Sequence, residues 1–202
     1  IAAAATLPPA RLTRAKRLIA DLIRFGVTKY NLAGQPLPDL PPGHRILVPG
    51  QVEDDASIRT GCDAVATNLG LLQAARAANP EAVILYKPHP DVEAGLRTGA
   101  IPEAEARGLA DMVLTRTDPV ALLAQVNEVW TMTSLLGFEA LLRGVPVTCL
   151  GTPFYAGWGL TTDLGRVPAR RQARPGLPAL VQAALIEYPR YRDPVTGLPC
   201  PV

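Results

Sequence analysis

The sequence has few cysteines, few aromatic residues and no long apolar run. These features argue against a disulfide-rich protein, a zinc protein and a membrane-spanning protein. The three cysteines, Cys62, Cys149 and Cys200, are widely spaced and odd in number, which fits neither a disulfide framework nor a zinc site. No apolar run approaches the roughly 20 residues that cross a bilayer. Aromatic residues make up only 5% of the chain, but the 48% hydrophobic content supplies the core of one ordinary domain. These values predict a globular protein without a metal site or a membrane span.

An excess of charge of one sign is also nearly absent, since the formal net charge is +2. So small a balance does not indicate nucleic acid, and no such partner is expected. The basic residues nevertheless gather in two places, residues 11–29 and residues 166–174. Each group is either a solvated face or a surface that attracts an anionic acceptor or a membrane carrying acidic lipids.

The start of the chain lacks both a methionine and the ordered regions of a signal peptide, so we interpret the sequence as part of a longer protein. Residues 1–43 are predicted to form an amphipathic helix, near 10–25, and a linker rich in proline and glycine. Residues 166–202 are predicted to form a C-terminal extension with one helix, near 177–187, and a proline-rich coil.

Between these segments, residues 44–165 alternate short apolar strands with helices. We expect strands near residues 45–48, 82–86, 111–114, 128–131 and 145–150, and helices near residues 61–78, 119–125 and 134–143. This alternation predicts an α/β fold, a Rossmann-like parallel sheet with helices on both faces. Ligands of such sheets bind outside the carboxyl ends of the strands, and four motifs lie there.

The first motif, residues 48–57, follows the first strand and contains three consecutive acids, Glu53, Asp54 and Asp55. Carboxylates favour helix N-termini, so these acids either cap the next helix or project a carboxylate into the cleft. A projecting carboxylate would serve as nucleophile or base in a sugar transfer.

The second motif, residues 86–91, reads YKPHPD at the end of a strand. His89 is one of only two histidines, and the prolines on either side of it restrict its backbone. A lone histidine is often structural. Together with Lys87, however, His89 predicts a cationic pocket for a phosphate, in which it donates a proton or a hydrogen bond to a leaving group.

The third motif, residues 131–147, places Thr133 and Ser134 where a strand gives way to a helix. They either cap the helix or help its free N–H groups to bind an anion. Glu139, one turn into an apolar helix, requires a partner, for which a ribose diol is suitable.

The fourth motif, residues 151–161, places three aromatic residues in a glycine-rich loop. The loop is either packed against the protein or serves as a platform for a sugar or base.

Together the motifs resemble the bacterial capsule polysaccharide biosynthesis family of retaining β-Kdo glycosyltransferases, which transfer 3-deoxy-D-manno-oct-2-ulosonic acid (Kdo). The matching segments are TKYN (28–31), PGQVEDDAS (49–57), YKPHPD (86–91), TMTSLLGFEALLRG (131–144) and PFYAGWGLT (153–161). The resemblance implies a GT-B architecture, in which two Rossmann-like domains face each other across a cleft. This chain would be the donor-binding half, and the acceptor-side domain of the same protein would precede residue 1.

The resemblance also implies roles for single residues. His89 and Pro90 match the pair that contacts the phosphate of CMP. Thr133 and Ser134 match a hydroxyl pair on the same phosphate. Glu139 matches the residue that holds the ribose hydroxyls in GT-B donor domains.

The implied reaction transfers Kdo, with retention of configuration, from CMP-Kdo to a lipid-linked oligosaccharide of the capsule linker. Retention suggests either a same-face attack or a double displacement, for which Asp55 is expected as the nucleophile, with Asp54 and Glu53 as alternatives. CMP is a good leaving group, so neither a metal nor another cofactor is expected. The protein would work in the cytoplasm, peripheral to the inner membrane. The alternatives are a nucleotide-sugar-binding module without activity and a GT-B relative that epimerises sugar nucleotides.

Overall fold

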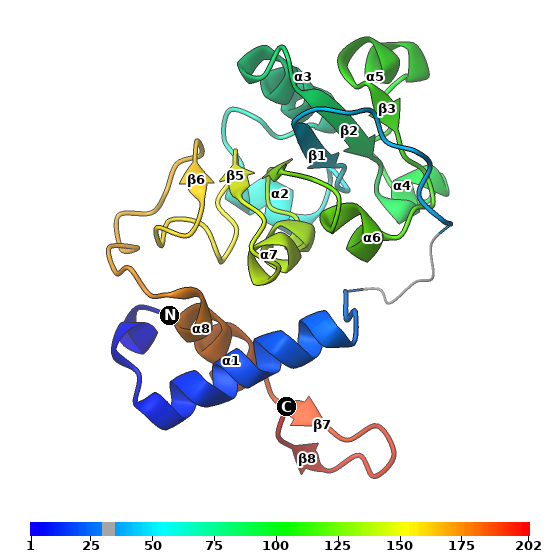
Figure 1. Ribbon diagram of the computed structural model, residues 1–202. Helices are drawn as coiled ribbons and strands as arrows, with labels where there is room; N and C mark the ends of the chain where they lie inside the picture. The colour runs from blue at the N-terminus through cyan, green and yellow to red at the C-terminus, as the bar shows by residue number, and fades with distance from the viewer. Residues whose placement is uncertain (30–34) are drawn as a thin grey trace.

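The computed structural model describes residues 1–29 and 35–202 and centres on a sheet of six parallel strands (Figure 1). The strands are β1 (Arg45–Pro49), β2 (Val83–Lys87), β3 (Met112–Val113), β4 (Glu128–Thr131), β5 (Val147–Cys149) and β6 (Thr162–Asp163). Their order across the sheet, β3-β2-β1-β4-β5-β6, is that of Rossmann-type nucleotide-binding folds. The predicted α/β fold is therefore confirmed.

The other elements connect or extend the sheet. In chain order they are η1 (Ala2–Thr6), α1 (Pro9–Arg24), α2 (Ala56–Gly61), α3 (Asn68–Ala78), α4 (Pro90–Glu93), α5 (Glu103–Leu109), α6 (Pro119–Leu123), α7 (Leu135–Leu142), α8 (Leu177–Val181), the π-helix η2 (Gln182–Glu187), β7 (Tyr191–Arg192) and β8 (Pro199–Cys200). Strands β7 and β8 form a separate antiparallel hairpin.

Side chains along the strands alternate between two cores, one on each face of the sheet. Leu47 and Leu85 point to the face that α1, α6, α7 and α8 cover. Ile46 and Ile84 point to the face that α2, α3 and α5 cover. Figure 1 shows α3 and α5 on the opposite side of the sheet from α7 and α1. Helices therefore cover both faces, as the strand pattern predicts.

The structure differs in detail from the predicted elements, and the short helices α2, α4 and α5 were not predicted. The helix expected at 61–78 begins only at Asn68, because Cys62 ends α2 in an extended conformation and the Thr67 hydroxyl then starts α3 by accepting the Gly70 N–H. Strand β6 was not predicted, since it has only two residues and both are polar. The C-terminal coil contains the β7–β8 hairpin, whose turn is held by the Asp193 carboxylate through hydrogen bonds from the backbone N–H groups of residues 195 and 196.

Helix α1 is amphipathic, as predicted, and packs against α8 and η2 (Figure 1). Its Ala15 is fully buried, Leu18 and Leu22 pack on the core, and Arg11 forms an ion pair of 2.9 Å with Glu187 of η2. The predicted N-terminal and C-terminal segments therefore meet in space, and the domain boundaries proposed for them stay a prediction. Within the described ranges no helix is both long and apolar enough to cross a membrane.

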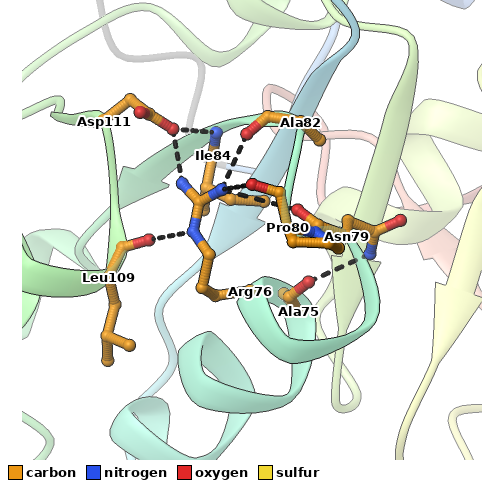
Figure 2. A network of polar contacts seen from close by, with 8 residues as sticks. All are labelled: Ala75, Arg76, Asn79, Pro80, Ala82, Ile84, Leu109 and Asp111. Carbon is orange, nitrogen blue, oxygen red and sulfur yellow. Dashed lines mark hydrogen bonds and ion pairs between the residues drawn. The ribbon is translucent and has the colours of Figure 1, made fainter.

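At the amino end of β2 and β3, Arg76 at the end of α3 organises the backbone (Figure 2). Its guanidinium donates to the carbonyl oxygens of residues 79, 80, 82 and 109 at 2.9–3.4 Å. It also pairs at 2.5 Å with Asp111, whose carboxylate accepts the Ile84 N–H at 2.7 Å. The Arg76 side chain thus links α3, the loop that follows it and the amino ends of β2 and β3.

Candidate active site

The site lies where the direction of strand addition reverses. The chain runs from β1 outward to β2 and β3, and then returns to β4 on the other side of β1. In an open parallel sheet this switch point leaves a crevice outside the carboxyl ends of the two central strands. A cavity of about 750 Å³ lies there, lined by the segments that follow β1, β2, β3 and β4 and by Thr28 and Lys29. We call it the main cavity.

A buried amide, Gln51, ties the loop after β1 to the loop after β4. Its Nε2 donates to Thr133 Oγ1 at 2.9 Å, and its Oε1 accepts the Thr133 N–H at 2.9 Å and the Thr131 hydroxyl at 3.2 Å. The Thr133 hydroxyl in turn donates to Ser57 Oγ at 3.3 Å. Because this network is buried, it holds the two central loops in one arrangement. The residue pattern alone indicated no role for Gln51.

Gly50, directly after β1, lets two of these loops approach each other. A Cβ added there would lie 2.9 Å from the Tyr86 hydroxyl oxygen and 3.2 Å from the backbone nitrogen of His89. Any larger residue would push the segment after β1 away from the segment after β2. The proximity of Asp55 and His89 to one cavity therefore depends on this glycine.

The structure separates the three consecutive acids. Only Asp55 lines the main cavity. Asp54 pairs with Arg97 at 2.8 Å on the exposed surface, and Glu53 accepts the backbone N–H of Asn68 at 2.7 Å. The carboxylates of Asp54 and Glu53 are thus engaged in holding the loop.

Asp55 also caps α2, because its Oδ1 accepts the Ser57 N–H at 2.8 Å. This hydrogen bond is the main cause that lowers the pKa of Asp55, and the positive charges of Lys29 and Arg97 lower it further. The carboxylate is therefore ionised at neutral pH, as a nucleophile requires. Asp55 therefore both caps α2 and lines the main cavity.

His89 caps α4 and lines the main cavity. Its Nδ1 accepts the Asp91 N–H at 3.1 Å, which leaves the proton of the neutral ring on Nε2. Burial lowers the pKa of His89 most, and the nearby cations Lys29, Lys87 and Arg97 lower it as well, against the attraction of Asp91. The ring is therefore neutral at pH 7 and carries its N–H on Nε2.

Lys87 and Pro90, on either side of His89, line the same cavity. Lys87 is 7% exposed, and burial lowers its pKa, while the carboxylates of Glu93 and Asp118 favour the charged form. A buried ammonium beside a neutral N–H donor suits a phosphate group.

Ser134 caps α7, since its Oγ accepts the Leu136 N–H at 3.2 Å. Together with Thr133 and the first residues of α7 it lines the main cavity. Both interpretations of this pair therefore apply at once: the hydroxyl caps the helix, and the helix N-terminus faces a cavity that an anion could enter.

Glu139 is 6% exposed on α7 and also reaches the main cavity. Its partner within the protein is the backbone N–H of Lys29, which donates to Oε1 at 2.8 Å. Burial raises the pKa of Glu139, although this hydrogen bond and the charge of Arg143 act in the other direction. The predicted need for a partner is thus met in part by the segment that follows α1.

The comparisons with known proteins agree with this arrangement. The family described as capsule polysaccharide biosynthesis protein matches residues 41–191. This chain belongs to that family. Two curated relatives are the capsule polysaccharide modification protein LipA of Neisseria meningitidis serogroup B, 54% identical over 151 residues, and the lipopolysaccharide-processing protein LpsZ of Rhizobium meliloti, 45% identical over 183 residues. These alignments cover 75% and 89% of this chain, but only 21% and 41% of the relatives, so the chain spans less than half of either protein.

Two solved structures from Thermosulfurimonas dismutans have the same fold. The KpsC beta Kdo 2,7 transferase is 39% identical and matches all of this chain with a TM-score of 0.84. The KpsC beta Kdo 2,4 transferase is 34% identical and matches 98% of the chain, also with a TM-score of 0.84. Each match covers 62% of the solved chain. The resemblance that the motifs indicated is confirmed.

In this family member the main cavity also has walls that the motifs did not predict. Arg116 and Thr117, after β3, line it, and Arg116 has a left-handed φ of 49°, which is unusual for a residue with a side chain. The Thr117 hydroxyl is buried and makes no hydrogen bond within the described part of the chain. The only signal for these residues was their place after a strand of the sheet. Thr28 and Lys29 of the TKYN motif line the cavity, while Tyr30 and Asn31 lie outside the described residues.

The aromatic loop of the fourth motif is packed rather than a platform in the main cavity. Tyr155 is fully buried, donates to the Ser134 carbonyl oxygen at 2.5 Å and contacts Phe138. Trp158 is 7% exposed and donates to the Phe154 carbonyl oxygen. Phe154, 36% exposed, lines a cavity other than the main cavity. Across residues 1–29 and 35–202 there is no group of acids, histidines and cysteines that could hold a metal ion.

Proposed function

We propose that this chain is the donor-binding half of a GT-B glycosyltransferase that transfers Kdo from CMP-Kdo to a lipid-linked acceptor of the capsule linker, with retention. One observation carries the proposal: Asp55, His89, Ser134 and Glu139, which come from motifs far apart in sequence, line a single cavity at the switch point of a Rossmann-type sheet. The likeness to the KpsC Kdo transferases supports the class of reaction.

In the proposed complex the donor runs across the carboxyl edge of the sheet. The Glu139 carboxylate accepts hydrogen bonds from the ribose hydroxyls. The phosphate lies between the N-terminus of α7, with Thr133 and Ser134, and the wall formed by the Lys87 ammonium group and the neutral His89 ring, which Pro90 helps to orient. The anomeric carbon then faces Asp55, the acid in this motif that lines the cavity.

The proposed chemistry is a double displacement. An oxygen of Asp55 forms a bond to the anomeric carbon while the bond from that carbon to the phosphate oxygen breaks, and CMP leaves with the electron pair. The His89 Nε2–H stabilises the charge on the leaving phosphate. An acceptor hydroxyl then attacks the anomeric carbon, the ester bond to Asp55 breaks, and the hydroxyl proton passes to a base on the acceptor-side domain. Two inversions give retention.

The proposal needs partners outside this chain. An acceptor-side domain of the same protein would supply that base and hold the lipid-linked oligosaccharide. Because the acceptor is a lipid, we place the protein in the cytoplasm at the inner membrane surface, where the basic residues around α1 would face acidic lipids. Within the described residues of α1, Arg14, Lys16 and Arg17 are exposed.

Donor binding is tested by calorimetric titration of the chain with CMP, with UMP as the control ligand. CMP should bind in preference to UMP, and His89→Ala should weaken CMP by about tenfold, since a hydrogen bond to a charged phosphate is lost. Equal affinity for UMP would favour the epimerase alternative. No binding of either nucleotide, repeated with the complete protein, would contradict the proposal.

The nucleophile is tested in the complete protein with Asp55→Asn and the matched control Asp54→Asn. Asp55→Asn should keep CMP affinity and lower turnover by about a thousandfold or more. Asp54→Asn should leave turnover within about threefold, because Asp54 pairs with Arg97 and lies outside the cavity lining. Equal losses in both variants would contradict the assignment of Asp55. Absence of turnover in the wild-type protein would favour a binding module.

A further inference from the structure

A second cavity of about 630 Å³ adjoins the main cavity. It lies between α2 and the segments at 152–154 and 166–171, and Ser57, Thr133 and Leu135 line both cavities. Ser57 is only two residues beyond Asp55 in the loop and helix that follow β1. A ligand in the second cavity would therefore lie next to the reacting end of the main cavity.

Three arginines from one short segment, Arg166, Arg170 and Arg171, line the second cavity, against a single acid, Asp63. Arg171 is positioned by the protein, because its Nη1 donates to the carbonyl oxygens of Pro153 and Ala156 at 2.6 and 2.7 Å and its guanidinium lies over the Trp158 ring. Burial lowers the pKa of Arg171 most, and the charge of the nearby Arg170 lowers it further, against the charge of Asp163.

Arg166 and Arg170 have no such partners. Both side chains are exposed, and within the described residues neither forms an ion pair or a side-chain hydrogen bond. Their charges are therefore available to a ligand, whereas the two other arginines of residues 166–174, Arg171 and Arg174, donate to backbone carbonyl oxygens. This difference between the unpaired and the paired arginines indicates that the second cavity binds an anion.

The remaining lining suits a sugar. Thr60, Thr152 and the partly exposed Phe154 line the cavity. The two threonine hydroxyls donate to backbone carbonyl oxygens and keep their lone pairs as acceptors for sugar hydroxyls. Phe154 is held by Phe138 and Tyr155, with ring centroids at 5.0 and 5.3 Å. A fixed aromatic ring, hydroxyl groups and planar guanidinium groups match the faces, hydroxyls and planar carboxylate of an acidic sugar.

We propose that the second cavity is a subsite for an acidic sugar, in which Arg166 and Arg170 bind the sugar carboxylate and Phe154 packs against the ring. This inference rests on the proposed function, since it assumes that the main cavity holds the nucleotide. The carboxylate belongs either to the sugar of the donor or to the terminal sugar of the acceptor. Both share the same chemistry, and the experiment below separates them.

The test uses this chain and the double variant Arg166→Gln/Arg170→Gln, with Arg59→Gln as the matched control. Arg59 is an exposed arginine of α2, the helix beside the second cavity, but it lines neither cavity. The probes are the methyl β-glycoside of Kdo, its methyl ester, inorganic phosphate, CMP and CMP-Kdo. Each is titrated by calorimetry, and the glycoside is titrated both with and without saturating CMP. Thermal melting checks that the variants are folded.

If the subsite binds the acceptor sugar, the double variant should weaken the glycoside by about tenfold or more and leave CMP-Kdo unchanged. If it binds the donor sugar, the double variant should instead remove the affinity that CMP-Kdo has beyond CMP. In both cases Arg59→Gln should have no effect. Each of three results would overturn the inference. The methyl ester binds as well as the glycoside, inorganic phosphate binds as well as the glycoside, or the double variant has wild-type affinity for both the glycoside and CMP-Kdo.

Failure of the proposed function would look different. A wild-type chain that does not bind CMP contradicts the nucleotide site, while the arginine dependence of glycoside binding in the absence of CMP still decides whether the second cavity binds an acidic sugar. A chain that binds CMP but not the glycoside or the sugar of CMP-Kdo keeps the proposed function and loses the subsite.

Discussion

The two ends of the same sheet use polar groups in opposite ways. At the amino end of β2 and β3, Arg76 satisfies four backbone carbonyl oxygens and the Asp111 carboxylate (Figure 2). At the carboxyl end, polar side chains line a cavity, and the buried Thr117 hydroxyl makes no hydrogen bond within the described residues. One end has its polar groups matched by the protein. At the other end, side chains that bond to the protein backbone, such as Asp55, His89 and Glu139, also line a cavity.

The shifts in pKa follow the same division. His89, Lys87 and Glu139, all at the carboxyl end, are moved toward their neutral forms mainly by burial. Such desolvated groups cost stability unless a ligand or partner compensates them. Substitutions at the amino end should therefore change stability but not binding. Substitutions at the carboxyl end should change binding, and those that remove a cap or an unpaired polar group should change stability as well.

The largest effect is expected for Arg76→Met. It removes the donors from four carbonyl oxygens and the partner of Asp111, which should lower the free energy of unfolding by about 2–4 kcal/mol without changing CMP affinity per folded molecule. Urea unfolding and calorimetry measure the two quantities. Arg107→Met is the control, because its pair with Glu103 on α5 is exposed and should contribute less than about 0.5 kcal/mol. Equal losses of unfolding free energy in both variants would contradict the structural role of the Arg76 network.

Glu139→Gln should act at the other end. Glutamine retains an acceptor for the Lys29 N–H but not the buried charge, so unfolding should be no easier, while CMP affinity should fall by about 1–2 kcal/mol if the carboxylate binds the ribose. The control ligand is 2′,3′-dideoxy-CMP, whose affinity should be the same for wild type and variant. A similar loss for both ligands would argue against contact with the ribose hydroxyls.

A pH experiment examines the His89 cap. Because folding lowers the pKa of His89 below its usual value of 6.5, the unfolded chain binds the extra proton first, and stability should fall as pH falls below about 6.5. Protonation of Nδ1 also removes the acceptor for the Asp91 N–H, a cap that contributes about 1 kcal/mol. His89→Asn keeps a capping side chain that does not titrate. The free energy of unfolding of wild type relative to this variant should decrease from pH 7 to pH 5, whereas parallel curves would contradict the role of the cap.

The smallest effect is expected for Thr117→Val. Removal of a buried hydroxyl without a partner should stabilise the free protein by about 0.5–1 kcal/mol. If that hydroxyl contacts the nucleotide, CMP affinity should fall by about threefold to fivefold. Thermal melting measures the change in stability, and titration of the same preparation measures the change in CMP affinity. A change of the same sign in stability and affinity would show that Thr117 belongs with the structural end of the molecule.

The sequence predicted the sheet well because the two sides of each strand must be buried against different helices. Apolar strands at 45–48, 82–86 and 128–131 and the helices between them required a parallel sheet covered on both faces, which the structure has. Elements with no such requirement, β6 and the β7–β8 hairpin, left no apolar pattern and were missed.

The site was predicted in outline for a related reason. Residues after successive parallel strands meet at one edge, so the order of strands along the chain is enough to bring the acidic, histidine and hydroxyl motifs together. The roles of Gln51 and Thr117 could not be predicted, because a buried amide that bridges two loops and a hydroxyl that lacks a hydrogen bond have no pattern in the chain.

By itself, then, the sequence determined the class of fold, the family and the edge of the sheet at which the chemistry lies, because these depend on strand periodicity and on residues close together along the chain. Only the tertiary structure decided which of three adjacent acids faces the main cavity. That choice depends on Arg97 and Asn68, which bind Asp54 and Glu53 from distant parts of the chain and leave Asp55 at the cavity.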